Sequence, residues 1–558
     1  MPQRKYFSLL WMLLNFTVVK KIIPFLLFLF LFQNVRAQFE VQTVAEKSDY
    51  TSTSTYADVM QFIQALKSSP LLQVENFATT AERKELPLLI LADPLPESPA
   101  ALVNDDRIVV YIQANIHAGE VEGKAGVQML ARDILNGKYP GLLDEMVLLL
   151  VPILNADGND KIDTHNRTNQ NGPVNGVGVR YNGQHLDLNR DALKLETPEI
   201  RGVVSNIFNK WDPAITVDCH TTNGSYHEEP VTFVWMMNPN GERTLINYMR
   251  DDMMPSVSET LLNKYQVENV FYGEFIDRMN LEKGWISYAS EPRYLVNYVG
   301  VRNRLAILNE NYVYADFETR VNGSYHLLVS ILEFAASHKK EIKQLLAEAD
   351  KLTVERGIDP SVSDSFAIEY RGVPTPKPIT IKAFEADTIP GAKGYWRYKK
   401  SDRKRTVTVP YIADYYATRS VKFPYAYLIT VPDERVLDVL QNHGIRTERL
   451  ASDTELPVEG FQFEEINPAP RLFQGHYLNQ TEGKPVAETK TFKKGTVVVR
   501  TAQPLGNVIA YLLEPQSDDG LLKWNFFDRY LVPQWGRGYY PYPVYKVLSK
   551  QEFPTISE

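Results

Sequence analysis

The chain has 558 residues, a formal net charge of −8 at pH 7 and a hydrophobic content of 44%, which allows a sizeable buried core and two to four domains. Positive and negative side chains are interspersed without a long basic block, which argues against a nucleic-acid-binding protein. Cys219 is the single cysteine, so no intramolecular disulfide can stabilise the fold.

The amino terminus has the pattern of an export signal. Two lysines precede the apolar run Ile22–Phe32, and Ala37 is a small residue where a signal peptidase could cut. The run is shorter than the roughly 20 apolar residues of a membrane span. We expect residues 1–37 to be a signal peptide and the mature protein to be secreted or periplasmic, with no stable membrane span after cleavage. An earlier apolar patch, Tyr6–Val19, leaves open a start at Met12 or, if the signal is not cleaved, a membrane anchor.

Downstream of this segment, apolar strands alternate with helical patterns. The periodicity predicts helices over Tyr56–Leu66 and Val127–Leu135, and strands over Leu86–Leu91, Arg107–Ala114 and Met146–Leu154. Pro87 should confine its strand to a sheet edge or delay its start by one residue, because proline has no N–H to donate. The alternation is typical of an α/β fold with a mixed, largely parallel sheet and helices on both faces.

The same pattern continues through the middle of the chain. Thr197-Pro198-Glu199 combines a hydroxyl cap, an early proline and an acid, and so predicts a helix that runs to about Trp211. Strands are expected over Ala214–His220 and Arg304–Glu310. A helical pattern over Tyr325–Leu346, as one or two helices, closes this part of the chain.

From about Asp359 the composition changes to short β-rich runs between prolines and glycines. The runs are Pro378–Ala383, Arg405–Pro410 and Gly495–Arg500, with one helix expected over Glu434–Gly444. We therefore predict an α/β domain over residues 38–355 and a β-rich C-terminal accessory region over residues 356–558.

Chemically reactive side chains stand at the carboxyl ends of three predicted strands. His117 and Glu120 follow the second strand, His220 ends the strand that begins at Ala214, and Glu310 ends the last strand. In an open α/β sheet, sites assemble at these ends. Two imidazoles and one carboxylate are the ligands of a hydrolytic zinc site that keeps a fourth position for water. Glu310 is then a spare carboxylate that can handle a proton.

These residues resemble the zinc metallocarboxypeptidases of the carboxypeptidase A type, and the chain looks like an exported bacterial member. His117-Ala-Gly-Glu120 matches the H-x-x-E of that family, Asp187-Leu-Asn-Arg190 its D-x-N-R, His220 its third ligand and Glu310 its catalytic glutamate. Tyr288 lies in a segment that looks like the substrate-capping tyrosine segment. A lone H-x-x-E is weak evidence, but four matches in the right order are specific.

The resemblance implies one zinc ion per chain, held by His117, Glu120 and His220. It implies that Asp187 accepts a hydrogen bond from the first imidazole and so fixes its tautomer. Glu310 is expected to act as the general base. The plainer alternative for Glu310 is a salt bridge to one of the nearby arginines, Arg302 or Arg304.

The same resemblance implies a peptide substrate with a free C-terminal carboxylate. Asn189 and Arg190 are expected to bind this carboxylate, because the planar fork of arginine can grip both oxygens. Tyr288 is expected to close over the bound end. Arg167 looks like the arginine that polarises the scissile carbonyl, with Arg180 as a competitor.

Substrate preference is indicated by one further position. Leu295 corresponds to the residue that lines the side-chain pocket of the family, which predicts apolar substrate side chains. Arg293 nearby could reverse that preference. His165, His185 and His227 lie on polar loops near the motifs, and rim or loop positions are expected for them rather than metal binding.

Two other functions stay open at this point. A zinc amidase or endopeptidase acting on cell-wall peptides or acylated amino acids could use the same metal and Glu310. A catalytically silent binding protein could instead use C-terminal aromatics such as Trp535 and Tyr539-Tyr540-Pro-Tyr542 to grip a partner. The presence of Glu310 argues against the silent protein, which has no need of a proton carrier.

Overall fold

The computed structural model describes residues 39–222, 224–288, 290–361, 363–532, 535 and 538–557. The predicted signal peptide over residues 1–37 lies outside these ranges. Within them, no helix is both long enough and apolar enough to cross a membrane.

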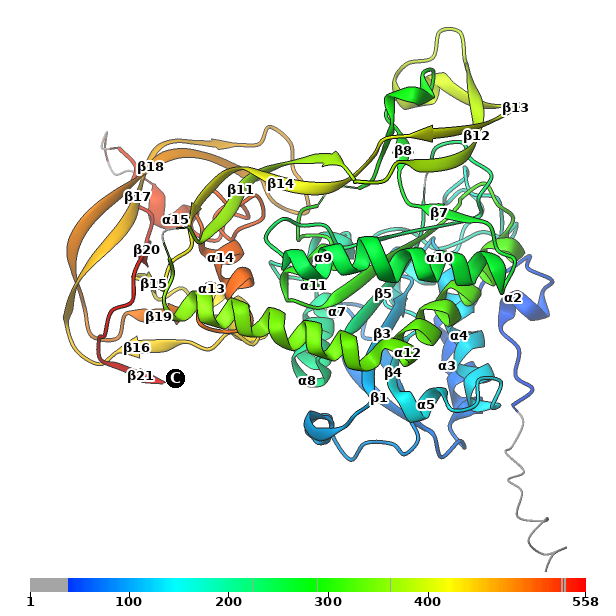
Figure 1. Cartoon of the computed structure of the whole chain (residues 1–558), viewed down its shortest axis with the longest axis horizontal. Coiled ribbons are helices and arrows are strands. Elements are labelled where there is room, and N and C mark those ends of the chain that lie inside the picture. The colour runs from blue at the N-terminus through cyan, green and yellow to red at the C-terminus, as the bar shows by residue number, and fades with distance from the viewer. Residues whose placement is uncertain are drawn as a thin grey trace, which may run out of the picture.

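An eight-stranded mixed sheet forms the centre of the first domain (Figure 1). Its strands lie in the order β1 (Leu72–Thr79), β2 (Glu85–Leu91), β4 (Met146–Val151), β3 (Ile108–Ala114), β5 (Ile215–Thr221), β10 (Leu305–Asn311), β6 (Val231–Trp235) and β7 (Asn269–Phe271). The four central strands β4, β3, β5 and β10 are parallel to one another, whereas β2 and β6 join them in the antiparallel sense. The predicted mixed, largely parallel α/β sheet is confirmed.

Pro87 does not mark a sheet edge, so that prediction is wrong. Strand β2 has β1 on one side and β4 on the other. Strand β4 pairs only with Leu89–Leu91, beyond the proline. Pro87 itself pairs with Asn76 of β1, where the register shifts before Ala78. Strand β2 can therefore include Pro87, which has no N–H to donate, because the pairing with β1 is irregular next to it.

Helices flank the sheet, and most begin and end near their predicted bounds. Helix α3 (Tyr56–Leu66) matches its prediction, and α4 (Glu122–Leu135) begins five residues earlier than predicted. The early turn of α4 was missed because it buries two charged residues, Glu122 and Lys124, which hide its apolar periodicity. The segment after Thr197 forms α7 (Pro198–Gly202), a π-helical stretch (Val203–Phe208) and α8 (Asn209–Trp211).

One long helix, α12 (Phe317–Ile358), closes the first domain where one or two helices were predicted. Asp316 caps its start by accepting from the N–H of Thr319 at 2.8 Å. The helix packs against α4 and the central strands. The predicted domain boundary at residues 355 and 356 falls in its last turn and stays a prediction.

The C-terminal region is β-rich, as predicted. A seven-stranded sheet contains β18 (Asn479–Phe492), β17 (Thr454–Pro468), β20 (Val544–Val547), β15 (Ala426–Ile429), β19 (Val497–Arg500), β16 (Glu448–Leu450) and β21 (Thr555–Ser557). Helices α13 (Glu434–Asn442) and α14 (Gly506–Leu513) accompany it. The hairpin of β12 (Ile379–Thr388) and β13 (Tyr398–Val409) projects from the body of the molecule (Figure 1).

A third sheet joins the two parts of the chain. Strands β11 (Ser365–Pro374) and β14 (Tyr411–Lys422) continue into β9 (Trp285–Ile286) and β8 (Glu274–Phe275) of the first domain. Ser287 extends this pairing by donating its N–H to the carbonyl of Ile412 at 2.9 Å. The buried hydrophobic core is likewise continuous across both parts. The C-terminal region therefore supports the segment of residues 274–288.

Candidate active site

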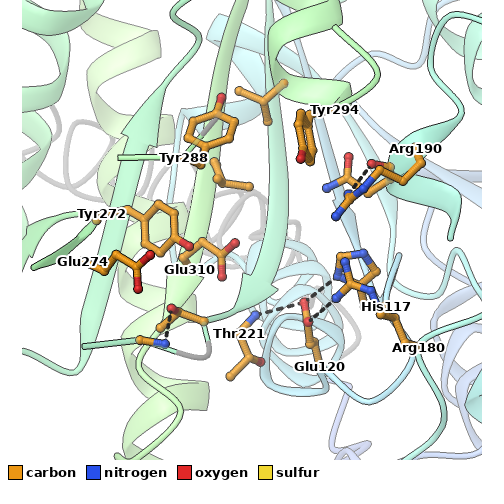
Figure 2. A pocket seen from close by; sticks show the side chains of 16 residues that line it. His117, Glu120, Arg180, Arg190, Thr221, Tyr272, Glu274, Tyr288, Tyr294 and Glu310 are labelled. Atoms are coloured by element: carbon orange, nitrogen blue, oxygen red, sulfur yellow. Dashed lines mark hydrogen bonds and ion pairs between the residues drawn. The ribbon is translucent and has the colours of Figure 1, made fainter. Parts of the chain in front are cut away.

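The carboxyl ends of β3, β5 and β10 bring the predicted residues together (Figure 2). His117 and Glu120 lie in the connection between β3 and α4, and His220 and Glu310 face each other across the parallel pair β5–β10. This proximity follows from the parallel order of the three strands, because their carboxyl ends share one edge of the sheet.

His117, Glu120 and His220 converge on one point. The Nδ1 atoms of His117 and His220 lie 3.1 Å apart, and each lies 3.0–3.1 Å from Oε2 of Glu120. All three side chains are buried. They form a group whose ligand atoms could hold a metal ion.

The second nitrogen of each ring decides what this point can bind. His117 Nε2 lies 3.0 Å from Oδ1 of Asp187, and His220 Nε2 lies 2.9 Å from Oδ2 of Asp218. A carboxylate only accepts, so each ring presents Nε2–H to its aspartate. With a cation at the shared point, both Nδ1 atoms would be left as acceptors beside Oε2 of Glu120, and the three atoms could coordinate it together. Tetrahedral zinc with bonds of about 2.0–2.2 Å separates its ligand atoms by about 3.3 Å, so the group fits that ion.

Asp187 holds the first imidazole, where the resemblance placed it. Asp218 holds the second imidazole in the same way, and the sequence reasoning missed it. Residues two apart on a strand face the same side, so the spacing of Asp218 and His220 could have indicated the contact. Gln113 in turn donates to Oδ1 of Asp218 at 2.9 Å, which orients the carboxylate.

Glu120 is held in its ionised form. Burial alone would raise its pKa, but His117 and Arg167 lower the pKa of Glu120 well below its usual value. Arg167 Nη1 donates to Oε1 at 2.8 Å, and the backbone N–H of Thr221 donates to Oε2 at 3.1 Å. The carboxylate is thus positioned by fixed donors before any metal binds.

The two candidate arginines occupy different places. Arg167 donates from Nε to Gln170 at 2.8 Å and from Nη2 to the carbonyl of Thr221 at 3.0 Å, in addition to its bond with Glu120. Arg180 lines the cavity instead, with Nε donating to Oδ2 of Asp187 at 2.9 Å (Figure 2). Arg167 therefore positions Glu120 without lining the cavity, whereas Arg180 faces the cavity.

A cavity of about 320 Å³ opens over the metal-binding group. Arg190 lies at one end of it, with its guanidinium 4.4 Å from the ring centroid of Tyr294 and Nη1 donating to the carbonyl of Asn189 at 2.6 Å. Asn189 accepts from the N–H of Leu295 at 3.0 Å. At this end of the cavity the positive charge of Arg190 is therefore held in place by an aromatic ring and a backbone carbonyl.

The apolar residue that lines the cavity is one position away from the residue that the sequence predicts. Leu295 is buried in the hydrophobic core, and the cavity is lined by its neighbour Val296 together with Leu308. Tyr288 lines the cavity as well, and its hydroxyl donates to Oδ1 of Asn297 at 3.3 Å. The carbonyl of Tyr288 accepts from the hydroxyl of Tyr415 on β14 at 3.1 Å, so the C-terminal region holds this segment.

Glu310 lies half-buried in the cavity wall. Burial raises its pKa to about 8, and the charges of His220 and Arg180 oppose that rise. A divalent cation held by the adjacent group would lower the pKa of Glu310 and so favour the carboxylate that can accept a proton. The alternative salt bridge is not supported, because Arg304 pairs with Asp212 at 2.7 Å and Arg302 donates to Tyr298 and Asn209.

The remaining histidines and the C-terminal aromatic residues are not part of the metal-binding group. His165 is on the surface, whereas His227 is buried and stacks on the ring of Tyr312 at 3.9 Å. The C-terminal aromatics do not form one exposed cluster, since Trp535 is 96% exposed and Tyr542 is 1% exposed. Cys219 is buried.

The family comparison covers the segments that carry His117, Glu120 and His220, and it ends before Glu310. Residues 59–243 match a family model described as zinc carboxypeptidase. This segment is similar to the zinc carboxypeptidases, which indicates a zinc-dependent hydrolase acting on peptide bonds, and His117, Glu120 and His220 are the group that could hold the metal.

Solved structures similar to this zinc carboxypeptidase include three metallocarboxypeptidases. The enzyme of Burkholderia cenocepacia has 16% identity and a TM-score of 0.38, over 51% of this chain and 70% of that one. The enzyme of Pseudomonas aeruginosa, in complex with (2-guanidinoethylmercapto)succinic acid, has 16% identity and a TM-score of 0.38, over 52% and 70%. Carboxypeptidase A of Helicoverpa armigera has 13% identity and a TM-score of 0.37, over 52% and 75%. No curated protein matches the sequence.

Proposed function

We propose that this zinc carboxypeptidase is an exported exopeptidase that removes the C-terminal residue from peptides with a free carboxylate. The export part rests on the lysines, apolar run and small residue that precede residue 38. The exopeptidase part rests on Arg190, a partly buried cation at one end of the cavity whose other wall carries Glu310.

His117, Glu120 and His220 would hold the zinc ion. When bound there, zinc supplies a Lewis acid that polarises the scissile carbonyl and makes water more acidic. Asp187 and Asp218 keep both imidazoles in the tautomer that offers Nδ1. One position must stay open to the cavity for water and substrate.

Glu310 is the proton carrier of the proposed reaction. It lies on the cavity wall, on the strand position next to His220. As a carboxylate it accepts the proton of the attacking water, and it then returns that proton to the leaving amine. The raised pKa of Glu310 makes its carboxylate the stronger base for the first transfer, and the proton that it then holds is the one given to the leaving amine.

Arg180 is the better candidate for stabilising the oxyanion. Its guanidinium faces the cavity, whereas the donors of Arg167 are directed at Gln170, Glu120 and Thr221. A cation fixed by Asp187 lies ready for the negative charge that develops on the carbonyl oxygen. We therefore transfer to Arg180 the role first assigned to Arg167, and we assign to Arg167 the positioning of Glu120.

Arg190 and Asn189 would bind the terminal carboxylate, and Tyr288 and Tyr294 would enclose the terminal side chain. Arg190 keeps Nε and Nη2 for a ligand while Nη1 bonds the carbonyl of Asn189. The apolar lining of Val296 and Leu308 favours uncharged terminal side chains. Arg293, which could have reversed this preference, instead pairs with Asp519 at 2.9 Å.

A peptide pool analysed by mass spectrometry tests this function. The purified protein should shorten free-acid peptides by single C-terminal residues, with apolar residues leaving first, and a chelator should stop the reaction. Peptides with an amidated C-terminus are the matched control and should resist. Internal or isopeptide cleavage would instead identify an amidase or endopeptidase, and no cleavage would point to a silent binding protein.

A further inference from the structure

Glu274 is a cavity carboxylate that the proposed reaction does not use. It stands on β8, at the edge of the sheet that joins the two parts of the chain, and it lines the same cavity as Glu120 and Glu310. Glu120 belongs to the metal-binding group and Glu310 carries the proton. A third acid in so small a cavity adds negative charge that must influence what binds there.

The place of Glu274 in the cavity indicates which part of a bound peptide it would meet. Figure 2 shows Glu274 beside Tyr272 at one side of Glu310, whereas Arg190 lies at the opposite side, above His117 in this view. A peptide whose carboxylate is bound at Arg190 and whose scissile carbonyl lies at Glu310 must continue towards Glu274. This carboxylate therefore faces the residue on the amino side of the bond that is cut.

The side chain of Glu274 is available to a ligand. It is 58% exposed, and its ion pair with Arg278 Nη2 spans 3.9 Å, which is near the limit for such a pair. That Arg278 nitrogen also donates to the carbonyl of Gly224 at 3.2 Å. A cavity of about 320 Å³ is near the lower limit for ligand pockets, roughly 300 Å³, so only the last few atoms of a peptide chain enter it.

We propose that Glu274 binds an ammonium group on the amino side of the scissile bond. The preferred substrates are then short peptides with a carboxylate at one end, bound by Arg190, and a positive charge one residue before the bond that is cut. The free α-amino group of a dipeptide and the side chain of a lysine share this chemistry. This proposal rests on the proposed carboxypeptidase function, because Arg190 sets the direction of the peptide.

Four substrates with the same terminal leucine test the proposal: the dipeptide Ala-Leu, and the N-acetylated dipeptides Ac-Ala-Leu, Ac-Lys-Leu and Ac-Glu-Leu. The wild-type protein should show a kcat/KM for Ala-Leu and Ac-Lys-Leu about three- to fivefold above that for Ac-Ala-Leu, the range expected of a partly exposed ion pair. Ac-Glu-Leu should be the poorest substrate. Salt at 0.5 M should reduce these ratios, because it screens exposed charges.

Variants of Glu274 give the decisive comparison. Glu274→Gln should bring the ratios close to one, and Glu274→Lys should make Ac-Glu-Leu better than Ac-Lys-Leu. Glu282→Gln is the matched control, because Glu282 is an exposed acid that pairs with Arg405 outside the cavity, and this variant should keep the wild-type ratios. A preference for Ala-Leu without one for Ac-Lys-Leu would identify the α-amino group as the bound cation, and the reverse would identify the lysine side chain.

The outcomes separate this proposal from the function on which it rests. If the wild-type protein cleaves all four substrates equally, or if Glu274→Gln keeps the preference, then Glu274 does not select a cation, while carboxypeptidase activity stands. If the wild-type protein releases leucine from none of them, both proposals are wrong. An equal rise for every substrate in Glu274→Gln would show a general field effect on the site and would also overturn the selection.

Discussion

Gln474, in the connection between β17 and β18, accepts a hydrogen bond of 2.7 Å from the backbone N–H of Asp187, the residue whose carboxylate holds His117. The contact joins positions 287 residues apart in the sequence. Close by, His476 lies 3.0 Å from the carboxylate of Glu196. The C-terminal region therefore supports the metal-binding group from behind.

We expect Gln474→Ala to weaken zinc binding by roughly tenfold, the lower end of the range for residues that orient metal ligands. The substitution leaves the backbone N–H of Asp187 without its acceptor and loosens the carboxylate that fixes His117. Competition against a chelator of known affinity measures the change. Gln480→Ala, an exposed glutamine on β18, is the control. Equal zinc affinity in both variants would show that the C-terminal contact does not reach the metal group.

His443 should make the protein sensitive to acid. Burial, together with the charge of Arg302, lowers the pKa of His443 to about 3, while the bond to the carbonyl of Leu193 opposes this change. The neutral ring accepts from the hydroxyl of Tyr298 at 2.6 Å and donates from Nε2 to Leu193 at 2.8 Å. It links the end of α13 to the first domain in this form.

The sign of the pH effect follows from the lowered pKa. Between about pH 6.5 and 3 the unfolded chain binds a proton at His443 that the folded chain does not, so the free energy of unfolding falls by up to about 1.4 kcal/mol per pH unit as pH decreases. Urea midpoints at pH 7, 6 and 5 measure the slope. His443→Gln should flatten it, whereas His165→Gln, at an exposed histidine, should not. Parallel slopes in all three proteins would contradict this account.

Glu310→Gln should fold and bind zinc but lose roughly 10²- to 10⁴-fold in kcat, the usual contribution of a general acid–base group. The amide has nearly the same shape as the carboxylate, yet it cannot accept the proton of water. Zinc content and kcat measured on the same preparation separate the two roles. Turnover within a few-fold of the wild-type value would require another base, and Glu291 would be the first to test.

His220→Ala should lose most of its zinc, because only two of three protein ligands remain at a site that also keeps a position for water. Metal analysis after dialysis gives the stoichiometry, expected to be about one zinc per wild-type chain. His165→Ala, outside the group, should retain the metal. Full zinc content in His220→Ala would disprove the ligand assignment.

The sequence predicts the centre of the site better than its periphery. His117, Glu120, His220 and Glu310 could be placed together because parallel strands bring their carboxyl ends to one edge of the sheet. Asp218 was also within reach of this reasoning, since it lies two residues before His220 on the same strand.

The periphery depends on contacts that local patterns do not encode. Arg167 and Arg180 lie in a long connection with little regular structure, so their order in the sequence does not show which one faces the cavity. Tyr288 is held by Tyr415, which lies 127 residues further along the chain. The shared sheet of β8, β9, β11 and β14 was not foreseen either, because the two-residue strands β8 and β9 are too short to show a periodicity.

Arg190 provides the most direct test of the central claim that this site recognises a C-terminal carboxylate. The measurement is kcat/KM for one peptide, as the free acid and as the amide, in the wild type, Arg190→Ala and Arg190→Lys. We predict that the wild type strongly prefers the free acid and that Arg190→Ala loses a few kcal/mol, roughly 10²-fold, for the acid alone. Arg190→Lys should recover only part of this, because a point charge cannot reproduce the planar fork. Equal cleavage of acid and amide by the wild type, or an equal loss for both in Arg190→Ala, would contradict exopeptidase recognition by Arg190.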